Sequence, residues 1–299
     1  MIYNVKKGCG MGYIRVLFLG FFVFSFSGCV ASLDRGNFSH IVVGHLSTPS
    51  FYGYKIIDTE KEKFSPKPPY SHIIERFEVR DGDCGVTDGW SDCANDRERY
   101  ELKEDSHSRD THDGSEYWYT WSIYFPNDYI NIYPTKTCLG QFHQTASHPV
   151  WMFQNQNKHQ NIKGGYWLDN QVEGYTTKYY KLIDEKDLRG KWHTIVLHVK
   201  WSRDSKKGFF KVWVDGRKKV DYHGKTMSAS EVYFKYGIYR SFLNRYKNAK
   251  QGEWMDTVQE EDKIPDYKDI PKVKIPTQVV YYSNVKRANT KKELFLGEK

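Results

Sequence analysis

Short stretches in which apolar and polar residues alternate recur along the chain from His72 onward. Such alternation predicts β-strands that turn one face to a core and the other to solvent. The expected strands are Ile73–Arg80, Tyr117–Phe125, Leu139–Gln144, Val150–Phe153, Thr194–Lys200, Phe209–Val214, Phe234–Tyr239 and Thr277–Lys286. Asp215-Gly216, directly after one of them, is the strongest hairpin signal in the chain. Many short strands separated by turns predict an all-β sandwich or jelly roll.

No long stretch of the chain has helical periodicity, and no internal repeat is present. Residues 244–274 are charged and lack strand periodicity, so we expect a long excursion before the last strand. Long connections of this kind often carry function. A length of 299 residues suits one large all-β domain or two small ones. Because the strand pattern is continuous, we expect one domain over residues 51–299.

Residues 1–28 have the features of a targeting segment, because basic residues accompany an apolar stretch from Ile14 to Phe26. The stretch ends in Ser25-Phe26-Ser27-Gly28-Cys29, which resembles the bacterial lipobox. We therefore expect a lipoprotein signal peptide, lipidation of Cys29 and a tether over residues 29–50. An ordinary signal peptide or an uncleaved anchor is the alternative. The predicted location is the bacterial cell envelope, with a lipid anchor as the membrane contact, or the exterior.

Export changes the charge of the mature chain. The formal net charge of the whole chain is +8, and it becomes +5 without the three basic residues of the leader. A moderately basic exported protein suits an anionic partner. Nucleic acid is not expected outside the cell, so an acidic polysaccharide is the expected partner. The aromatic content of 16 % fits stacking on sugar rings and fits the filling of a β-sheet core equally well.

The cysteines fit an oxidising compartment. Beyond the leader and Cys29, the chain contains Cys84, Cys93 and Cys138. Three cysteines allow one disulfide, and Cys84–Cys93 is the pair closest in sequence. Pairing with Cys138 is the alternative. No metal-type C-x-x-C motif is present.

Three segments place chemically useful side chains on one face of a strand. In Arg97–Lys103, the side chains of Arg99, Glu101 and Lys103 project together. They either line a groove or form a solvated strand face. In Gln141-Phe142-His143, an amide and an imidazole project together, and a polar outer face is the alternative.

The third segment is Tyr233–Arg240. Its period of two puts Tyr233, Lys235, Gly237 and Tyr239 on one face. We expect Gly237 to leave open space where a ligand can approach.

Together the three segments resemble the motifs of polysaccharide lyases with a concanavalin-like β-jelly-roll fold. Alginate lyases of polysaccharide lyase family seven carry an R-[ST]-E-L-R strand, a Q-[IV]-H strand and a Y-F-K-x-G-x-Y strand, in that order. Here they read Arg99-Tyr100-Glu101-Leu102-Lys103, Gln141-Phe142-His143 and Tyr233–Tyr239. The Lys235–Arg240 tail and the Cys84–Arg97 region are similar to the wider heparin lyase I and glucuronan lyase group. The resemblance covers about residues 70–290.

The resemblance implies a β-elimination on a uronate-containing glycan, such as alginate, glucuronan or a heparin-like chain. Arg99 and Gln141 would hold the uronate carboxylate, with the planar fork of arginine well suited to it. His143 would be the base, and Tyr239 would be the acid at O4 and, for one sugar stereochemistry, also the base. Lys235, on the same face, would lower the pKa of Tyr239.

The resemblance also implies substrate contacts for Lys235, Glu101, Lys103 and Arg240. Three departures put alginate specificity in doubt: Tyr100 replaces a small residue, Lys103 replaces the second arginine, and Arg240-Ser241 replaces an amide pair.

Two other functions have to be weighed. A jelly-roll hydrolase needs two carboxylates, which such enzymes usually carry in an E-x-D-x-x-E motif. The nearest match here begins with Glu185 and Asp187, but Gly190 occupies the position of the second glutamate. A non-catalytic carbohydrate-binding lipoprotein would not need His143 and Tyr239 together. No pattern requires a cofactor; some relatives bind calcium, for which Asp81-Gly82-Asp83 is the candidate loop. We expect a monomer.

Overall fold

The computed structural model describes residues 40–43, 52–87, 89–104, 111–156, 161, 163–260 and 271–295. The predicted signal peptide and Cys29 lie outside the described residues. Of the predicted tether, residues 40–43 are described, and they form an edge strand. Within the described residues, no helix has the length and apolar character needed to span a membrane.

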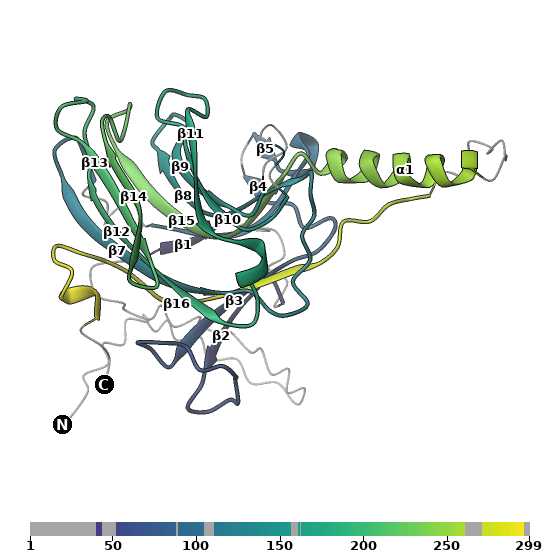
Figure 1. Ribbon diagram of the computed structural model, residues 1–299, viewed down its shortest axis with the longest axis horizontal. Coiled ribbons are helices and arrows are strands. Elements are labelled where there is room, and N and C mark those ends of the chain that lie inside the picture. The colour runs from purple at the N-terminus through teal and green to yellow at the C-terminus, as the bar shows by residue number, and fades with distance from the viewer. Residues whose placement is uncertain are drawn as a thin grey trace, which may run out of the picture. The chain divides into compact units, whose positions relative to one another are not determined.

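Two seven-stranded antiparallel sheets make up the fold (Figure 1). In strand order, sheet A consists of β1 (His40–Val43), β6 (Arg97–Glu104), β15 (Val232–Ser241), β8 (Lys136–Gln144), β9 (Pro149–Gln154), β10 (Tyr166–Asn170) and β11 (Lys178–Ile183). Sheet B consists of β14 (Arg217–His223), β13 (Phe209–Val214), β12 (Trp192–Lys200), β7 (Glu116–Tyr124), β16 (Gln278–Ala288), β3 (Ile73–Val79) and β2 (Tyr54–Asp58). The fold is the predicted β-jelly-roll sandwich.

Several short elements and one long helix complete the described part of the chain. They are the ribbon of β4 (Val86–Thr87) and β5 (Trp90–Ser91), the 3-10 turns η1 (Cys93–Asn95), η3 (Glu185–Asp187) and η5 (Glu293–Phe295), and the helix α1 (Leu243–Glu260). The β4–β5 ribbon and η1 lie directly before β6, so this connection stands beside the strand that carries the first motif.

Aromatic side chains fill the space between the two sheets. Trp151 of sheet A stacks on Phe210 of sheet B with 4.0 Å between the ring centroids. Trp121 of sheet B packs on Phe234 of sheet A, with the centroids 5.1 Å apart. These rings are almost fully buried. Much of the high aromatic content therefore serves the core.

All eight predicted strands are present, with ends shifted by no more than three residues. The alternation of apolar and polar residues predicted these strands correctly because one face of each strand packs on the opposite sheet. The hairpin signal is also confirmed: Asp215 and Gly216 have φ of 50° and 77°, the left-handed conformations that a tight two-residue hairpin turn requires.

The expected long excursion before the last strand is present between β15 and β16, and its first half forms the helix α1, which the sequence did not predict. Leu243 at its start packs on Ile132 and Ile275. Beyond this turn, Figure 1 shows α1 extending away from the sheets. Because such a helix needs no wide apolar face, it leaves no helical hydrophobic pattern in the sequence.

Candidate active site

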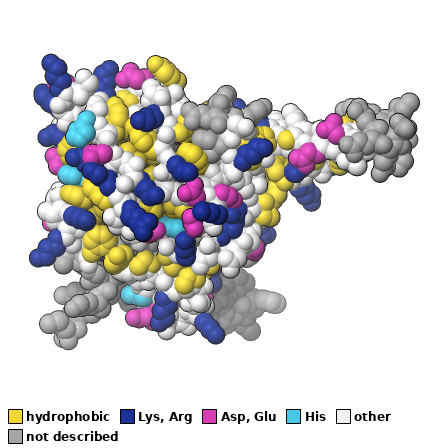
Figure 2. Space-filling view, viewed as in Figure 1, with side chains coloured by type: hydrophobic (Ala, Val, Ile, Leu, Met, Phe, Trp, Pro, Cys, Tyr) yellow, Lys and Arg dark blue, Asp and Glu magenta, His cyan; other side chains and the backbone are white. Residues whose placement is uncertain are grey.

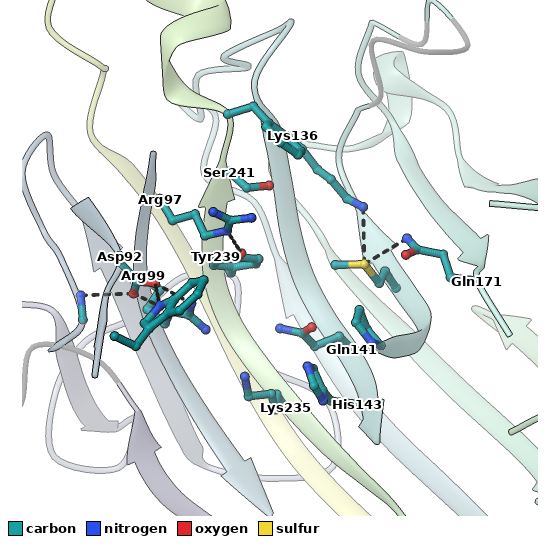
Figure 3. A pocket seen from close by; sticks show the side chains of 15 residues that line it. Asp92, Arg97, Arg99, Lys136, Gln141, His143, Gln171, Lys235, Tyr239 and Ser241 are labelled. Carbon is teal, nitrogen blue, oxygen red and sulfur yellow. Dashed lines mark hydrogen bonds and ion pairs between the residues drawn. The ribbon is translucent and has the colours of Figure 1, made fainter. Parts of the chain in front are cut away.

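The three motifs meet on the outer face of sheet A, because their strands β6, β15 and β8 are neighbours. Lys235 of β15 lies opposite Gln141 of β8 in the strand register, and Tyr239 lies opposite Arg99 of β6. A cleft of about 460 Å³ opens on this face (Figure 3). The predicted residues that line it are Arg99, Gln141, His143, Lys235 and Tyr239. The sequence prediction that these side chains share a groove is therefore confirmed.

Arg99 is held by two carboxylates. Its Nε donates to Asp92 Oδ2 at 2.5 Å, and its Nη2 donates to Asp92 Oδ1. Its Nη1 lies 3.2 Å from Glu101 Oε2, and the guanidinium carbon lies 4.3 Å from the centroid of the Tyr239 ring. Although burial disfavours its charge, the hydrogen bonds with Asp92 and the charge of Glu101 raise the pKa of Arg99. Arg99 is therefore a permanently charged and rigidly placed cation.

Glu101 is an anchor beneath the cleft rather than a substrate contact, which corrects the sequence prediction. Its side chain is 1 % exposed. It accepts a hydrogen bond from Gln141 Nε2 at 2.6 Å, and its other oxygen lies 3.6 Å from Lys235 Nζ. Together with the contact to Arg99, these bonds tie the three strands of the cleft floor. A buried carboxylate in this position orients the groups around it and has little surface to offer a sugar.

His143 is arranged to accept a proton. Its Nδ1 lies 2.8 Å from the carbonyl oxygen of Gln144. Because a carbonyl only accepts, Nδ1 carries the hydrogen and Nε2 has the lone pair. Burial, and secondly the charge of Lys235, lower the pKa of His143 to about 4. The imidazole is therefore neutral at physiological pH.

Tyr239 receives a hydrogen bond from Arg97, whose Nε lies 2.6 Å from the phenol oxygen. Burial raises the pKa of Tyr239, while the charges of Arg99 and Arg97 act in the opposite direction. The sequence prediction named Lys235 as the charge that lowers this pKa, whereas the largest lowering charges are those of the two arginines. Since Arg97 occupies one lone pair of the oxygen, the hydroxyl hydrogen of Tyr239 is left to point elsewhere.

Arg240 does not belong to the cleft, which corrects another predicted substrate contact. It is fully buried, with 0 % exposure, and its guanidinium pairs with Glu98 and donates to the Pro276 carbonyl at 2.6 Å. Successive side chains of a strand point to opposite faces, and Arg240 directly follows Tyr239. Arg240 therefore points away from the cleft, into the space between the sheets.

Gly237 also serves the core rather than a ligand. With φ of 129°, a Cβ at this position would lie 2.3 Å from the Tyr100 carbonyl oxygen and 2.9 Å from the Phe77 ring. Backbone conformation and close packing therefore require glycine here. Lys103 lies opposite Lys235 on the site face, but it does not line the cleft.

Several further side chains of the cleft wall escaped the sequence prediction, among them Trp90, Arg97, Lys136 and Phe242. Arg97 lies two residues before Arg99 on the same strand, so both side chains project from the same face. Strand alternation alone could therefore have placed Arg97 in the cleft. Lys136 begins β8, and its Nζ lies 3.7 Å from Asp169 Oδ2. Trp90 and Phe242 lie in or beside connections, where no periodic pattern marks a side chain.

Comparisons with known proteins identify the family of the chain. The sequence model of the family described as polysaccharide lyase matches residues 60–286. The chain belongs to the polysaccharide lyase family. It is thus a lyase that acts on polysaccharides. A search of curated proteins found none that matches this lyase.

Solved structures are similar to the lyase at low sequence identity. A glucuronan lyase from Trichoderma reesei is 17 % identical, with TM-score 0.47, over 84 % of this chain and 95 % of that one. An alginate lyase from Pseudomonas aeruginosa is 14 % identical, with TM-score 0.43, over 81 % and 100 %. A family 131 β-glucanase domain from Podospora anserina is 13 % identical, with TM-score 0.51, over 85 % and 86 %.

The lyase contains the predicted disulfide, because Cys84 and Cys93 are bonded, with 5.3 Å between their Cα atoms. The bond closes the connection that carries β4 and β5. Cys138 is a buried free thiol, and burial raises its pKa to about 12. It is therefore protonated and unreactive at neutral pH.

In the loop suggested for calcium, both aspartates have protein partners. Both oxygens of Asp83 are hydrogen-bonded, to the Tyr52 hydroxyl at 2.6 Å and to the Arg80 amide at 2.7 Å. Asp81 lies 3.7 Å from Lys247 Nζ. Elsewhere among the described residues, the candidate metal ligands of Asp58, Glu60 and His72 lie within 4.8 Å of one another. In that cluster Lys61 pairs with Asp58 at 2.9 Å, so a cation is already supplied by the protein.

Proposed function

We propose that this polysaccharide lyase cleaves a uronate-containing, anionic glycan by β-elimination. The observation that carries the proposal is the joint presence of a neutral imidazole and a phenol in one cation-lined cleft. His143 has its lone pair on Nε2, and Tyr239 is hydrogen-bonded by Arg97. Each of these groups has the protonation state that one half of the reaction needs.

The charges of the cleft suit a uronate. Four basic side chains line it, namely Arg97, Arg99, Lys136 and Lys235. Asp92 is the one carboxyl side chain among the described residues that line it, and Arg99 neutralises it. Figure 2 shows further Lys and Arg side chains over much of the visible face. This field attracts a polyanion and withdraws charge from a bound carboxylate.

Neutralising the carboxylate makes the adjacent C5 proton more acidic. The amide nitrogen of Gln141 carries two hydrogens, and Glu101 accepts one of them, so the other is available to a sugar carboxylate. Lys235 and Arg99 place positive charge beside it. This arrangement stabilises the negative charge that develops as the C5 proton leaves.

The reaction then proceeds in balanced steps. His143 Nε2 takes the C5 proton, and the electron pair of the C5–H bond forms the C4=C5 double bond. The C4–O4 bond breaks with its electron pair on O4, which takes the hydroxyl proton of Tyr239. Where the C5 hydrogen lies on the same side of the ring as O4, Tyr239 serves as both base and acid. The hydrogen bond from Arg97 and the charge of Arg99 stabilise its phenolate in either case.

A hydrolase finds less support in the cleft. The likeness to the β-glucanase domain is a likeness of fold. Glycoside hydrolysis needs one carboxyl group as acid and another as base or nucleophile. Although burial disfavours ionisation of Asp92, the bonds from Arg99 hold its pKa below the ordinary value. An ionised carboxylate tied to arginine cannot donate a proton.

The signal-peptide-like segment of residues 1–28 and the lipobox-like sequence before Cys29 support a proposal about the location of the lyase. We infer that the lyase is exported and anchored to the cell envelope through Cys29, where an acidic polysaccharide is accessible. Labelling with a radioactive fatty acid, compared between the wild type and Cys29→Ala, tests the anchor. Equal label in both proteins would contradict it.

One assay separates the candidate functions. The purified protein is mixed with alginate, polyglucuronate and heparin, and the ultraviolet absorbance of the unsaturated uronate product is followed. We expect absorbance to rise with at least one of them, and Tyr239→Phe to abolish the rise while binding is retained. Cleavage without absorbance would establish a hydrolase, and binding without cleavage would establish a lectin.

A further inference from the structure

Two aromatic rings stand exposed in the wall of the cleft. Among the described residues that line it, Trp90 and Phe242 are the large apolar side chains with much free surface, at 43 % and 39 % exposure. They come from distant parts of the sequence: Trp90 lies in β5, and Phe242 lies between β15 and α1. An exposed ring gains little stability for the fold, so its place in a cleft points to a ligand.

Arg97 connects both rings to the phenol of Tyr239. Its guanidinium carbon lies 5.5 Å from the centroid of the Trp90 ring and 5.8 Å from that of Phe242. Its Nε donates to Tyr239 and its Nη1 donates to the Asn95 carbonyl. Among the described residues, Nη2 makes no further hydrogen bond, so this donor is available. Arg97 lies on the side of Tyr239 that faces away from His143 (Figure 3).

The Trp90 ring is held in place by the same carboxylate that anchors Arg99. Its indole Nε1 donates to Asp92 Oδ1 at 3.0 Å. Asp92 Oδ2 also accepts the Gly85 amide hydrogen at 3.1 Å. The Cys84–Cys93 disulfide closes the connection around this cluster. The ring is therefore presented rigidly although it is exposed.

Phe242 is held just as firmly, in a backbone conformation that L residues rarely adopt. Its φ is 63°. The Phe242 amide donates to the Asp96 carbonyl at 3.0 Å, and Thr135 Oγ1 donates to the Phe242 carbonyl at 2.9 Å. The guanidinium carbon of Arg245 lies 4.0 Å from the ring centroid. Strain retained at a ligand cleft commonly has a functional reason.

We propose that Trp90, Phe242 and Arg97 form a subsite, the aromatic clamp, for the uronate that leaves with O4. This inference rests on the β-elimination proposed above. The two rings offer flat apolar surfaces to the C–H faces of a sugar, and Nη2 of Arg97 offers a donor to its carboxylate. Because Tyr239 delivers its proton to O4, a subsite just beyond Tyr239 holds the departing sugar.

Calorimetric binding of a uronate tetrasaccharide and steady-state kinetics test the clamp. Trp90→Ala and Phe242→Ala should each weaken binding and raise KM about tenfold, with kcat at saturation changed less than about threefold. Trp90→Phe, which keeps a flat ring, should recover most of the affinity. The matched control is Tyr70→Ala, because Tyr70 is 53 % exposed and lies outside the cleft. Thermal unfolding verifies that each variant folds, and Phe242→Leu replaces Phe242→Ala if the latter does not.

The outcomes are distinguishable. Affinity and KM within about twofold of the wild type in both ring variants would overturn the clamp. A loss of kcat without a change in affinity would also overturn it, because the rings would then act on chemistry. If the wild type binds uronate oligomers through these rings but yields no unsaturated product, the rings remain a uronate-binding site, whereas the β-elimination and the assignment of the rings to the departing sugar both fall.

Discussion

Arg97 Nε donates a hydrogen bond to the phenol oxygen of Tyr239, with 2.6 Å between the two atoms. This contact fixes the ring and leaves its hydroxyl hydrogen directed away from the arginine. It also provides a positive charge where a phenolate forms when Tyr239 loses its proton. A side chain absent from the three motifs thus holds in position the phenol that we propose as the proton donor.

Replacing Arg97 should therefore impair the chemical step. For Arg97→Gln, we expect kcat to fall about a hundredfold, as is usual when one donor to a developing charge is lost. Because Arg97 opposes the rise in the pKa of Tyr239, its loss should move the alkaline limb of kcat to higher pH. The control is Arg203→Gln, since Arg203 is exposed and pairs with Asp113 away from the cleft. An unchanged alkaline limb would show that Arg97 does not act through Tyr239.

The acid limb of activity should report His143. Its pKa is lowered to about 4 by burial and by Lys235, so the imidazole is neutral above that pH. We expect kcat/KM to be maintained as pH falls through the weakly acid range and to be lost near pH 4. In Lys235→Met, the pKa of His143 should rise and the acid limb should move toward neutral pH. Measuring the imidazole titration by NMR in both proteins checks the assignment, and identical titrations would contradict it.

Strand periodicity carried most of the prediction of fold and site. It placed Arg99, Gln141 and His143 on one face, and strand adjacency then brought them together. The same rule, applied fully, would have excluded Arg240 and included Arg97. Since Arg240 follows Tyr239 directly, it must point the other way, where Glu98 receives it.

Side chains outside the strands follow no such periodicity. Trp90 is placed by a disulfide-closed connection and an indole hydrogen bond to Asp92. Phe242 is placed by a left-handed backbone that no pattern marks. The anchoring role of Glu101 depends on three partners from three strands. Such arrangements arise from tertiary contacts, which periodicity does not encode.

Arg240 should matter for stability and little for catalysis. In Arg240→Met, the Glu98 carboxylate loses its ion pair while it remains 2 % exposed. We expect the free energy of unfolding to fall by about 3–5 kcal/mol, the usual cost of breaking a buried pair. The kcat and KM of the folded protein should remain near the wild-type values. Urea unfolding and steady-state kinetics provide the two readouts, and Arg240→Met with Glu98→Gln should recover part of the stability. A rise in KM without a loss of stability would contradict this prediction and would indicate that Arg240 contacts the substrate.

The disulfide links stability to substrate binding. In Cys84→Ser with Cys93→Ser, the connection that carries Trp90 and Asp92 is no longer closed. For a ring this small, we expect unfolding free energy to fall by about 2–3 kcal/mol. KM should rise because Trp90 and Asp92 lose their fixed positions, and Asp92 also anchors Arg99. Thermal unfolding and kinetics are measured with and without reductant. The reduced wild type should behave like the double variant, whereas the variant itself should not respond to reductant. If KM stays unchanged in the reduced wild type and in the double variant, the connection holds its shape without the disulfide, and the hydrogen bonds of Asp92 suffice to keep Trp90 in place.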